Sequence, residues 1–167
     1  IDGGFLYLCG QWMNYMQNAE VKDCVVSNLT FNPNGIEYLY GSAIELFAID
    51  QADVHDIELN HFDIRFKNTS SYGYGGVLAN YWIDDFRLAG LVCNDVQIDS
   101  AYDTEGSYLF AYTCNYTRIE DCTIGGGTST FPNGCLYFSA SGNDVTLRNV
   151  EIAYNTNEYQ YGQIYFY

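Results

Sequence analysis

The sequence predicts an all-β chain folded as a right-handed parallel β-helix, a solenoid of about five coils. Three observations predict it: a degenerate repeat of about thirty residues, apolar residues alternating with a period of two, and polar or glycine residues where that alternation changes phase. A helical apolar period is absent over twelve residues, apart from a weak one between Trp12 and Val21.

The first element of the repeat is a strand pattern that occurs five times, with apolar residues on either side of a polar pivot. The pivots are Asn28, His61, Asp95, Asp121 and Asn149, at spacings of 33, 34, 26 and 28 residues. Two residues instead of one separate the apolar side chains across each pivot, so the strand must bend there. Asn and Asp tolerate the left-handed backbone that such a bend uses. We therefore expect these five residues to form one corner of the repeat.

The second element is a short alternating strand that follows a glycine. The glycines are Gly4, Gly41, Gly76, Gly106, Gly134 and Gly162. Glycine adopts backbone conformations that other residues avoid, so these positions predict a second corner. Short strands joined by bends pair in parallel with the next copy, and each copy needs its neighbours to bury its apolar face.

An antiparallel β-sandwich is the alternative all-β fold, and it would connect its strands by tight hairpins. Only Asn34-Gly35 and Asn133-Gly134 match the two-residue hairpin signal, and each follows a proline. A sandwich also gives no reason for five copies of one strand pattern. The sequence therefore favours the parallel β-helix.

The combination of the two elements, as in Gly75-Gly76-Val77-Leu78 and Gly3-Gly4-Phe5-Leu6, resembles the pectin-lyase-like superfamily of right-handed β-helices. It is most similar to the surface-protein branch with repeats of the polymorphic outer-membrane-protein type. The resemblance covers nearly the whole chain. It implies the fold, but it carries little information about function.

The composition restricts the possible partners and the compartment. The chain has 21 acidic and 6 basic residues in 167, a net charge of −15, which disfavours nucleic acids, anionic membrane surfaces and polyanionic sugars. This acidity either solvates an aromatic surface that includes 17 tyrosines or marks scattered calcium sites. No apolar run is long enough to span a bilayer. Acidity, scarce lysine and three glycosylation sequons together favour an extracellular or cell-surface glycoprotein.

The sequons place candidate glycans on Asn68, Asn115 and Asn28, with Asn68 favoured because it lies in a polar loop. The six cysteines divide by their place in the repeat. Cys24, Cys93 and Cys122 fall on inward positions, where a thiol packs as a small hydrophobe. Cys9, Cys114 and Cys135 fall near strand ends or outward positions, and they are the candidates for disulfides.

No catalytic, cofactor or metal constellation can be assembled from the sequence. No cysteine pair has zinc-ligand spacing. His61 occupies a pivot, which gives it a structural role, and His55 lies nearby. The pectin-lyase-like resemblance directs attention to paired acids, for which Asp84 and Asp85 are the first candidates. Neither the His nor the Arg-x-Lys that accompanies such a pair in the polygalacturonase-like type lies near them.

The functional expectation is a structural protein. The chain 1–167 predicts one β-helix domain without recognisable polar caps, which is either a fragment of a longer β-helix or a unit that stacks head to tail into a filament or surface stalk. An adhesin-like module that binds glycans through aromatic residues, including Trp12 and Trp82, is the alternative. A polysaccharide lyase or hydrolase is less favoured. The expected partners are further copies of the chain and glycans.

Overall fold

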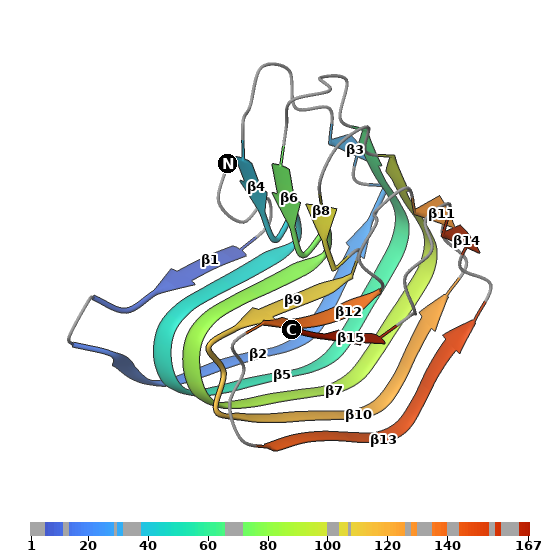
Figure 1. Cartoon of the computed structure of the whole chain (residues 1–167). Coiled ribbons are helices and arrows are strands. Elements are labelled where there is room, and N and C mark those ends of the chain that lie inside the picture. Colours follow the sequence, from blue (N-terminus) through green and yellow to red (C-terminus); the bar gives the residue numbers. More distant parts are fainter. Residues whose placement is uncertain are drawn as a thin grey trace.

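The computed structural model shows an all-β chain in which most strands belong to one large sheet (Figure 1). It describes residues 6–11, 14–28, 30–31, 38–65, 72–99, 104–106, 108–125, 128–129, 135–139, 144–153, 156–157 and 164–167. The sequence prediction of an all-β fold with parallel strands is confirmed for these residues. Trp12 and Asn68 lie outside them.

The strands differ greatly in length, and two of them span 22 residues each. Their bounds are β1 Leu6–Cys9, β2 Met16–Ser27, β3 Thr30–Phe31, β4 Tyr38–Tyr40, β5 Ile44–Arg65, β6 Tyr72–Tyr74, β7 Leu78–Asp99, β8 Thr104–Glu105, β9 Leu109–Tyr112, β10 Tyr116–Gly125, β11 Thr128–Ser129, β12 Leu136–Ser139, β13 Asp144–Ala153, β14 Thr156–Asn157 and β15 Ile164–Phe166.

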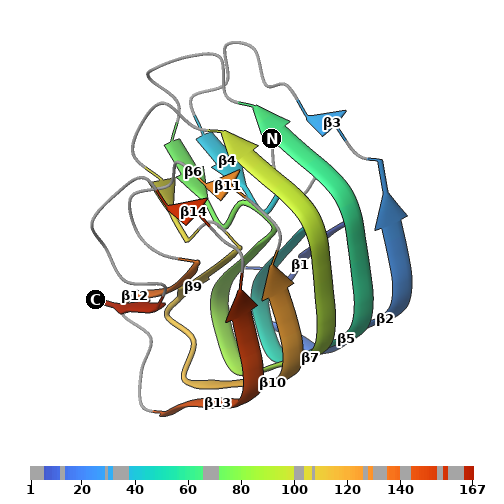
Figure 2. The same cartoon turned by 90° about the vertical axis from the view of Figure 1, so that its right-hand side faces the viewer.

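All pairings between these strands are parallel, and they form a twelve-stranded sheet and a three-stranded sheet, β4-β6-β8. One path through the large sheet is β1-β5-β7-β9-β12-β15, and further along the same long strands the order is β2-β5-β7-β10-β13. Figure 2 shows the second set side by side as curved strands. The chain thus returns repeatedly to lie beside its previous passage, for example with Ile44 of β5 paired to Leu78 of β7.

The long strands bend at residues with left-handed backbone. In β5 these are Ala48, Asp56 and His61, with φ of 55°, 55° and 53°. In β7 the equivalent positions are Trp82, Gly90 and Asp95, each with positive φ. The core residues on either side of His61, Leu59 and Phe62, are both buried, so the alternation changes phase there. These bends let one strand supply side chains to the core from more than one direction (Figure 1).

The five pivots all have positive φ, between 52° and 58°, but they do not form one corner as the sequence alignment predicts. His61 and Asp95 lie opposite each other between β5 and β7, and Asn28 precedes them on the β2 side. The pairs Glu120–Ala89 and Ile124–Cys93, in contrast, place Asp121 opposite Gly90.

The alignment of the last two repeats is therefore wrong by five residues. Asn149 lies beside Asp121, so both belong to the corner of Asp23, Asp56 and Gly90. Two corners five residues apart carry the same polar signature between apolar residues, and local pattern cannot distinguish them. The glycine corner needs a smaller correction: Gly41, Gly75 and Gly106 have positive φ, so Gly75 and not Gly76 marks it. A Cβ on Gly75 would stand only 2.2 Å from the Leu78 carbonyl oxygen, which is why glycine is required there.

The core consists of ladders of apolar side chains in which each residue lies beside its counterpart on the next strand. One such ladder is Val21, Val54, Leu88, Ile119 and Leu147. Asn80 interrupts another ladder: it pairs with Leu46 and Ala111 and is fully buried. Neither polar atom of its amide has a hydrogen-bond partner among the described residues. A buried polar group of this kind destabilises the fold because it loses its hydration without compensation.

We predict that Asn80→Leu raises the free energy of unfolding by about 1–3 kcal/mol, since it removes that desolvation penalty and keeps the number of side-chain atoms. Chemical denaturation followed by circular dichroism measures the change. Leu46→Asn, which places the same amide one strand away, should lower stability by a similar amount. An Asn80→Leu variant that is less stable than the parent chain would contradict the view that the buried Asn80 amide destabilises the fold.

Candidate functional site: an aromatic groove and a charged face

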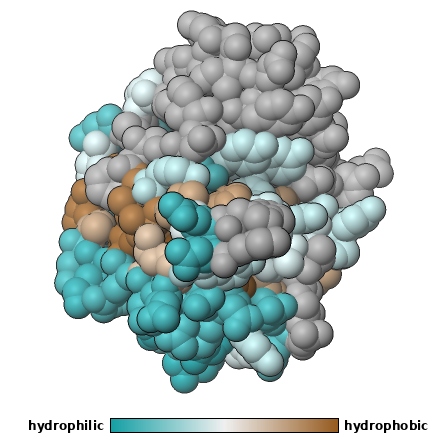
Figure 3. Space-filling model, turned by 90° about the vertical axis from the view of Figure 1, so that its left-hand side faces the viewer, coloured by the Kyte–Doolittle hydropathy of each residue, from teal (hydrophilic) through white to brown (hydrophobic). Residues whose placement is uncertain are grey.

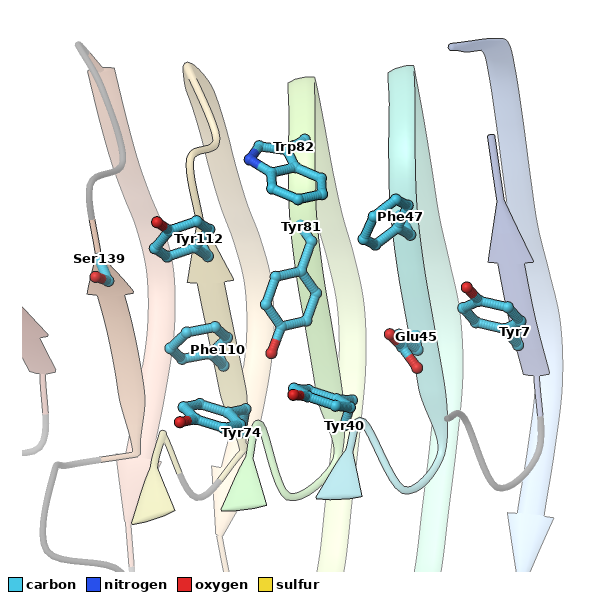
Figure 4. Close-up of a pocket in the computed structure, with 10 residues that line it drawn as sticks. All are labelled: Tyr7, Tyr40, Glu45, Phe47, Tyr74, Tyr81, Trp82, Phe110, Tyr112 and Ser139. Carbon is cyan, nitrogen blue, oxygen red and sulfur yellow. The ribbon is translucent and has the colours of Figure 1, made fainter. Parts of the chain in front are cut away.

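The most distinctive surface feature is a groove of about 590 Å³ with mainly aromatic walls (Figure 4). Its walls come from strands of both sheets. The residues that line the groove are Tyr7, Tyr40, Glu45, Phe47, Tyr74, Tyr81, Trp82, Phe110, Tyr112 and Ser139. A concave site of this size with a few polar groups is typical of small-ligand and saccharide recognition.

The floor of the groove is the side of β5, β7 and β9 that faces away from the apolar core. Alternation along β5 sends Ile44 and Leu46 into the core and Glu45 and Phe47 into the groove. Parallel pairing then aligns Phe47 with Tyr81 and Tyr81 with Tyr112, which gives an aromatic ladder across three strands. The ladder follows from register, since each aromatic side chain lies at the same height on its own strand.

The second wall comes from β4 and β6, which the glycine corners turn back over the start of β5 and β7. The rings of Tyr40 and Tyr74 stack at 5.4 Å with an interplanar angle of 11°. Tyr40 also meets Tyr81 edge to face at 5.5 Å, and Tyr74 packs on Phe110 at 5.1 Å. These contacts hold the two walls at a fixed separation.

Trp82 lies at the rim between two strands, with its ring 4.8 Å from Phe47 and 6.5 Å from Tyr112. Its φ of 55° is unusual for a large side chain and costs backbone energy. The equivalent corner positions on the neighbouring strands are held by the small residues Ala48 and Thr113. All three residues have a φ of 55°, so the strain belongs to the corner, and Trp82 differs from its counterparts in the size of its ring.

The groove is partly open. Tyr7 and Tyr112 are 44% and 37% exposed, whereas Phe110 and the polar residues Glu45 and Ser139 are buried. Among the described residues that line it there is no Lys, Arg or His. Apolar side chains also gather at the surface on the side of the molecule at the left of Figure 1, beside hydrophilic ones (Figure 3).

A second feature is the charged outer face of β2, β5, β7, β10 and β13. Arg87 contacts Asp53 at 2.9 Å and Glu120 at 3.5 Å, and Arg118 contacts Asp85 at 2.8 Å. Lys22 and Arg148 lie on the same face, so four of the six basic residues are gathered there. Each ion pair joins neighbouring side chains within or between strands, and the face is a network of paired charges.

The acids and histidines singled out in the sequence lie in separate contacts. Asp84 accepts a hydrogen bond from the Asn115 amide at 2.6 Å, and Asp85 pairs with Arg118. His61 contacts Asp95 at 2.7 Å, which joins β5 to β7 at a corner. These contacts stabilise strand pairing. His55 contacts two carboxylates, Asp56 at 2.7 Å and Glu20 at 3.2 Å, and neither of these is Asp84 or Asp85.

Two of the three sequons can be located. Asn28 is exposed at a corner, and Asn115 is partly buried with its amide engaged by Asp84. Thr117 of the Asn115 sequon is buried.

The six cysteines are all free thiols in the structure. Cys93 and Cys122 are buried as expected, and Cys24 packs partly against the core. Of the disulfide candidates expected near strand ends or at outward positions, Cys9 is exposed, whereas Cys114 and Cys135 lie next to strand ends and are buried. The sequence placed these two at strand ends, where alternation gives no direction, and the bends turn them into the core.

Within the part of the chain that the structure describes, no three His, Cys, Asp or Glu side chains converge on a possible metal position. Among the same residues there is no helix with the length and apolarity to cross a membrane.

Sequence reasoning missed the groove as a site, although it noted the tyrosines and Trp82. The available signal was the spacing of the aromatic residues along the chain. Phe47, Tyr81 and Tyr112 are separated by about one repeat each, so they occupy paired positions on neighbouring strands. Glu45, Tyr40 and Tyr74 gave no local signal, because their meeting depends on how β4 and β6 fold back.

Comparison with known proteins gives no match to a family model, to a curated protein or to a solved structure. The function must therefore be argued from the geometry of the chain itself.

We predict that thiol alkylation of the native protein modifies Cys9 quickly and leaves Cys93, Cys114 and Cys122 unmodified. Burial raises the pKa of all three, in the case of Cys114 to about 12, so little reactive thiolate forms near neutral pH. Mass spectrometry after brief iodoacetamide treatment measures this, with denatured protein as the control in which all six react. Equal rates for Cys9 and Cys114 would be inconsistent with the packing.

We also predict that the contact between β2 and β5 at His55 stabilises the fold to an extent that depends on pH. Hydrogen bonds to Asp56, at 2.7 Å, and to Glu20, at 3.2 Å, raise the pKa of His55 above its ordinary value of 6.5. A raised pKa in the folded state means that protonation stabilises the fold. The stabilisation is complete below pH 6.5 and is lost as the pH rises through the folded value.

NMR titration of the His55 ring checks this prediction. Asp56→Asn and Glu20→Gln should each lower the His55 pKa, with the larger effect from Asp56→Asn. If neither variant moves the titration, the ion pairs have no energetic role.

Proposed function

We propose that the chain is an extracellular right-handed parallel β-helix that binds glycans through its aromatic groove. The observation that carries the proposal is the alignment of Phe47, Tyr81, Trp82 and Tyr112 along one groove. The repeated parallel return of the chain supports the β-helix, in agreement with the resemblance to pectin-lyase-like repeats. That resemblance supports the fold only.

The chemistry of the groove fits a sugar chain. The C–H faces of a pyranose pack on aromatic rings, while its hydroxyl groups need hydrogen-bond partners at the edges. Polar atoms of tyrosines, Ser139 and Glu45 lie among the aromatic rings of the groove. The aromatic ladder advances by one strand spacing, about 4.8 Å, so an extended glycan laid across the strands meets a new ring at each step.

The extracellular assignment rests on the acidity, the sequons and the scarcity of lysine. Binding without catalysis is the simpler proposal, because the acids of the charged face are engaged in ion pairs with arginine. Asp84 contacts Asn115, and Asp85 contacts Arg118. Neither acid is among the described residues that line the groove.

We predict that Trp82→Asn weakens glycan binding by about fivefold or more and leaves the fold as stable as before, or more so. Loss of the ring removes a stacking surface worth about 1 kcal/mol or more, whereas Asn suits a left-handed corner better than Trp does. A glycan array followed by calorimetry measures binding, and thermal unfolding measures stability.

Trp82→Phe is the matched control and should retain most of the affinity. Binding that persists undiminished in Trp82→Asn, or a glycan array without any hit on the parent chain, would overturn the proposal.

A structural filament built head to tail is the second candidate, and the match between the two edges of the sheet favours it. Among the described strands, β1 pairs only with β5, and β15 pairs only with β12. Phe166 and Ile164 of β15 are 61% and 38% exposed. A second copy that placed its β1 on β15 in register would continue the ladders, with Tyr7 on Tyr165 and Leu8 on Phe166.

We predict for this candidate thin fibres in negative-stain electron microscopy at about micromolar concentration, with an axial repeat of about 29 Å for the six strands from β1 to β15. Phe166→Lys should abolish them, because a charge on an edge strand opposes pairing. Tyr116→Lys, which alters an exposed ring on the charged face, should leave them intact. A monomer that persists at high concentration would eliminate the filament.

A further inference from the structure

The aromatic ladder in the floor of the groove has a direction. Phe47, Tyr81 and Tyr112 occupy paired positions on β5, β7 and β9, and Figure 4 shows them side by side. The ring centroids are 6.4 Å apart between Phe47 and Tyr81, and 6.1 Å apart between Tyr81 and Tyr112. The rings follow one another across the strands, so a ligand that touches all three must run across the strands as well.

The ladder is accessible, and its sides are bounded. Phe47 and Tyr81 are half-buried, and Tyr112 is 37% exposed. Trp82 lies on one side of the ladder, and Tyr40 of the β4 and β6 wall lies on the other (Figure 4). A ligand between these sides has to continue straight from one ring to the next. A sugar chain with an extended backbone does this, whereas a chain that winds into a helix turns away from the ladder.

The spacing of the rings fits one sugar for each strand. Parallel strands lie about 4.8 Å apart, which is close to the length of one pyranose in an extended β-1,4-linked chain. Successive sugars in such a chain are turned over relative to each other, so both faces of the sugar meet a ring. Glucose suits this arrangement because its ring substituents are equatorial and both of its faces carry only C–H groups. An axial hydroxyl group would press an unpaired polar group against an aromatic ring.

The charges of the chain restrict the glycan further. Among the described residues that line the groove there is no basic side chain. Four of the six basic residues, Lys22, Arg87, Arg118 and Arg148, lie on the charged face. A uronic-acid chain would bring further carboxylates to a protein that already has a net charge of −15, which opposes its approach. A neutral glycan avoids this repulsion.

We propose that the groove binds neutral, extended glycans of the β-1,4-linked glucose type, with one sugar stacked on each of Phe47, Tyr81 and Tyr112. This inference rests on the proposed glycan-binding function and adds its ligand class and the number of stacking positions. The next residues in the same register, Cys9 on β1 and Ser139 on β12, carry no ring. The ladder therefore offers three stacking positions, and a fourth sugar gains little.

The test is calorimetry on the whole chain with β-1,4-linked glucose oligomers of one to five sugars. Affinity should rise at least about fivefold with the second sugar and again with the third, and change by less than about threefold beyond it. Two further tetramers each change one property: α-1,4-linked glucose winds, and β-1,4-linked glucuronate carries carboxylates. Each should bind at least about tenfold more weakly than the β-1,4-linked glucose tetramer. This comparison needs no variant, so it stands even where a substitution in the groove reduces stability.

Tyr112→Ala removes the third ring of the ladder. The trimer should then bind within about twofold of the dimer, and the affinity for the dimer should stay within about threefold of that of the parent chain. Tyr116→Ala is the matched control, because it removes the same ring from a position that is 51% exposed and is not among the lining residues of the groove. It should keep the dependence on length. Thermal unfolding of each variant verifies that it is folded.

Equal binding of the three tetramers by the parent chain would overturn the inference and leave glycan binding in place. Binding of other glycans on an array without any of the glucose oligomers would do the same. A preference for the trimer that survives Tyr112→Ala, or that is lost equally in Tyr116→Ala, would overturn the three-position ladder. Absence of binding by any glycan would overturn both the inference and the proposed function.

Discussion

Parallel pairing between successive passages of the chain is the constraint on which the other features depend. Each strand lies beside the corresponding strand of the previous passage, so every side chain faces a counterpart one strand spacing away. Apolar residues such as Val54 and Leu88 therefore form continuous ladders, and no passage buries its apolar side by itself. A substitution is felt by the residues above and below it as well as by its own strand.

The same rule organises the charged side chains. Arg87 lies beside Asp53 because the register brings them to the same height. Arg118 lies opposite Arg87 and contacts Asp85, which lies two residues before Arg87 on β7. His61 and Asp95 form a comparable pair at a corner. Opposite charges on adjacent strands add modestly to stability. The facing Arg87 and Arg118 repel each other, and the ion pair that each makes with a carboxylate offsets this repulsion. The outer face is thus acidic overall and still compatible with close strand packing.

The groove arises from this regularity and from one departure from it. Repetition places an aromatic ring on three neighbouring strands, and the glycine corners turn β4 and β6 over them. Trp82 departs from the pattern, because its corner is occupied by alanine and threonine on the adjacent strands. The left-handed backbone is common to all three positions, so it is the large ring of Trp82 that is particular to this strand. Glu45 is also an exception, because it is a carboxylate among the mainly aromatic side chains that line the groove.

The sequence by itself determined the all-β class, the parallel arrangement, and the residues at which strands bend, because period-two alternation and left-handed backbone preferences are local properties. Tertiary structure decided which bends face each other. The corner of Asp121 joins that of Gly90 and not that of Asp95, since two corners with the same signature lie five residues apart. It also decided that Cys114 and Cys135 are buried and that Tyr40 meets Tyr81. These outcomes depend on how far the chain travels between strands before it pairs, and side-chain alternation does not encode that distance.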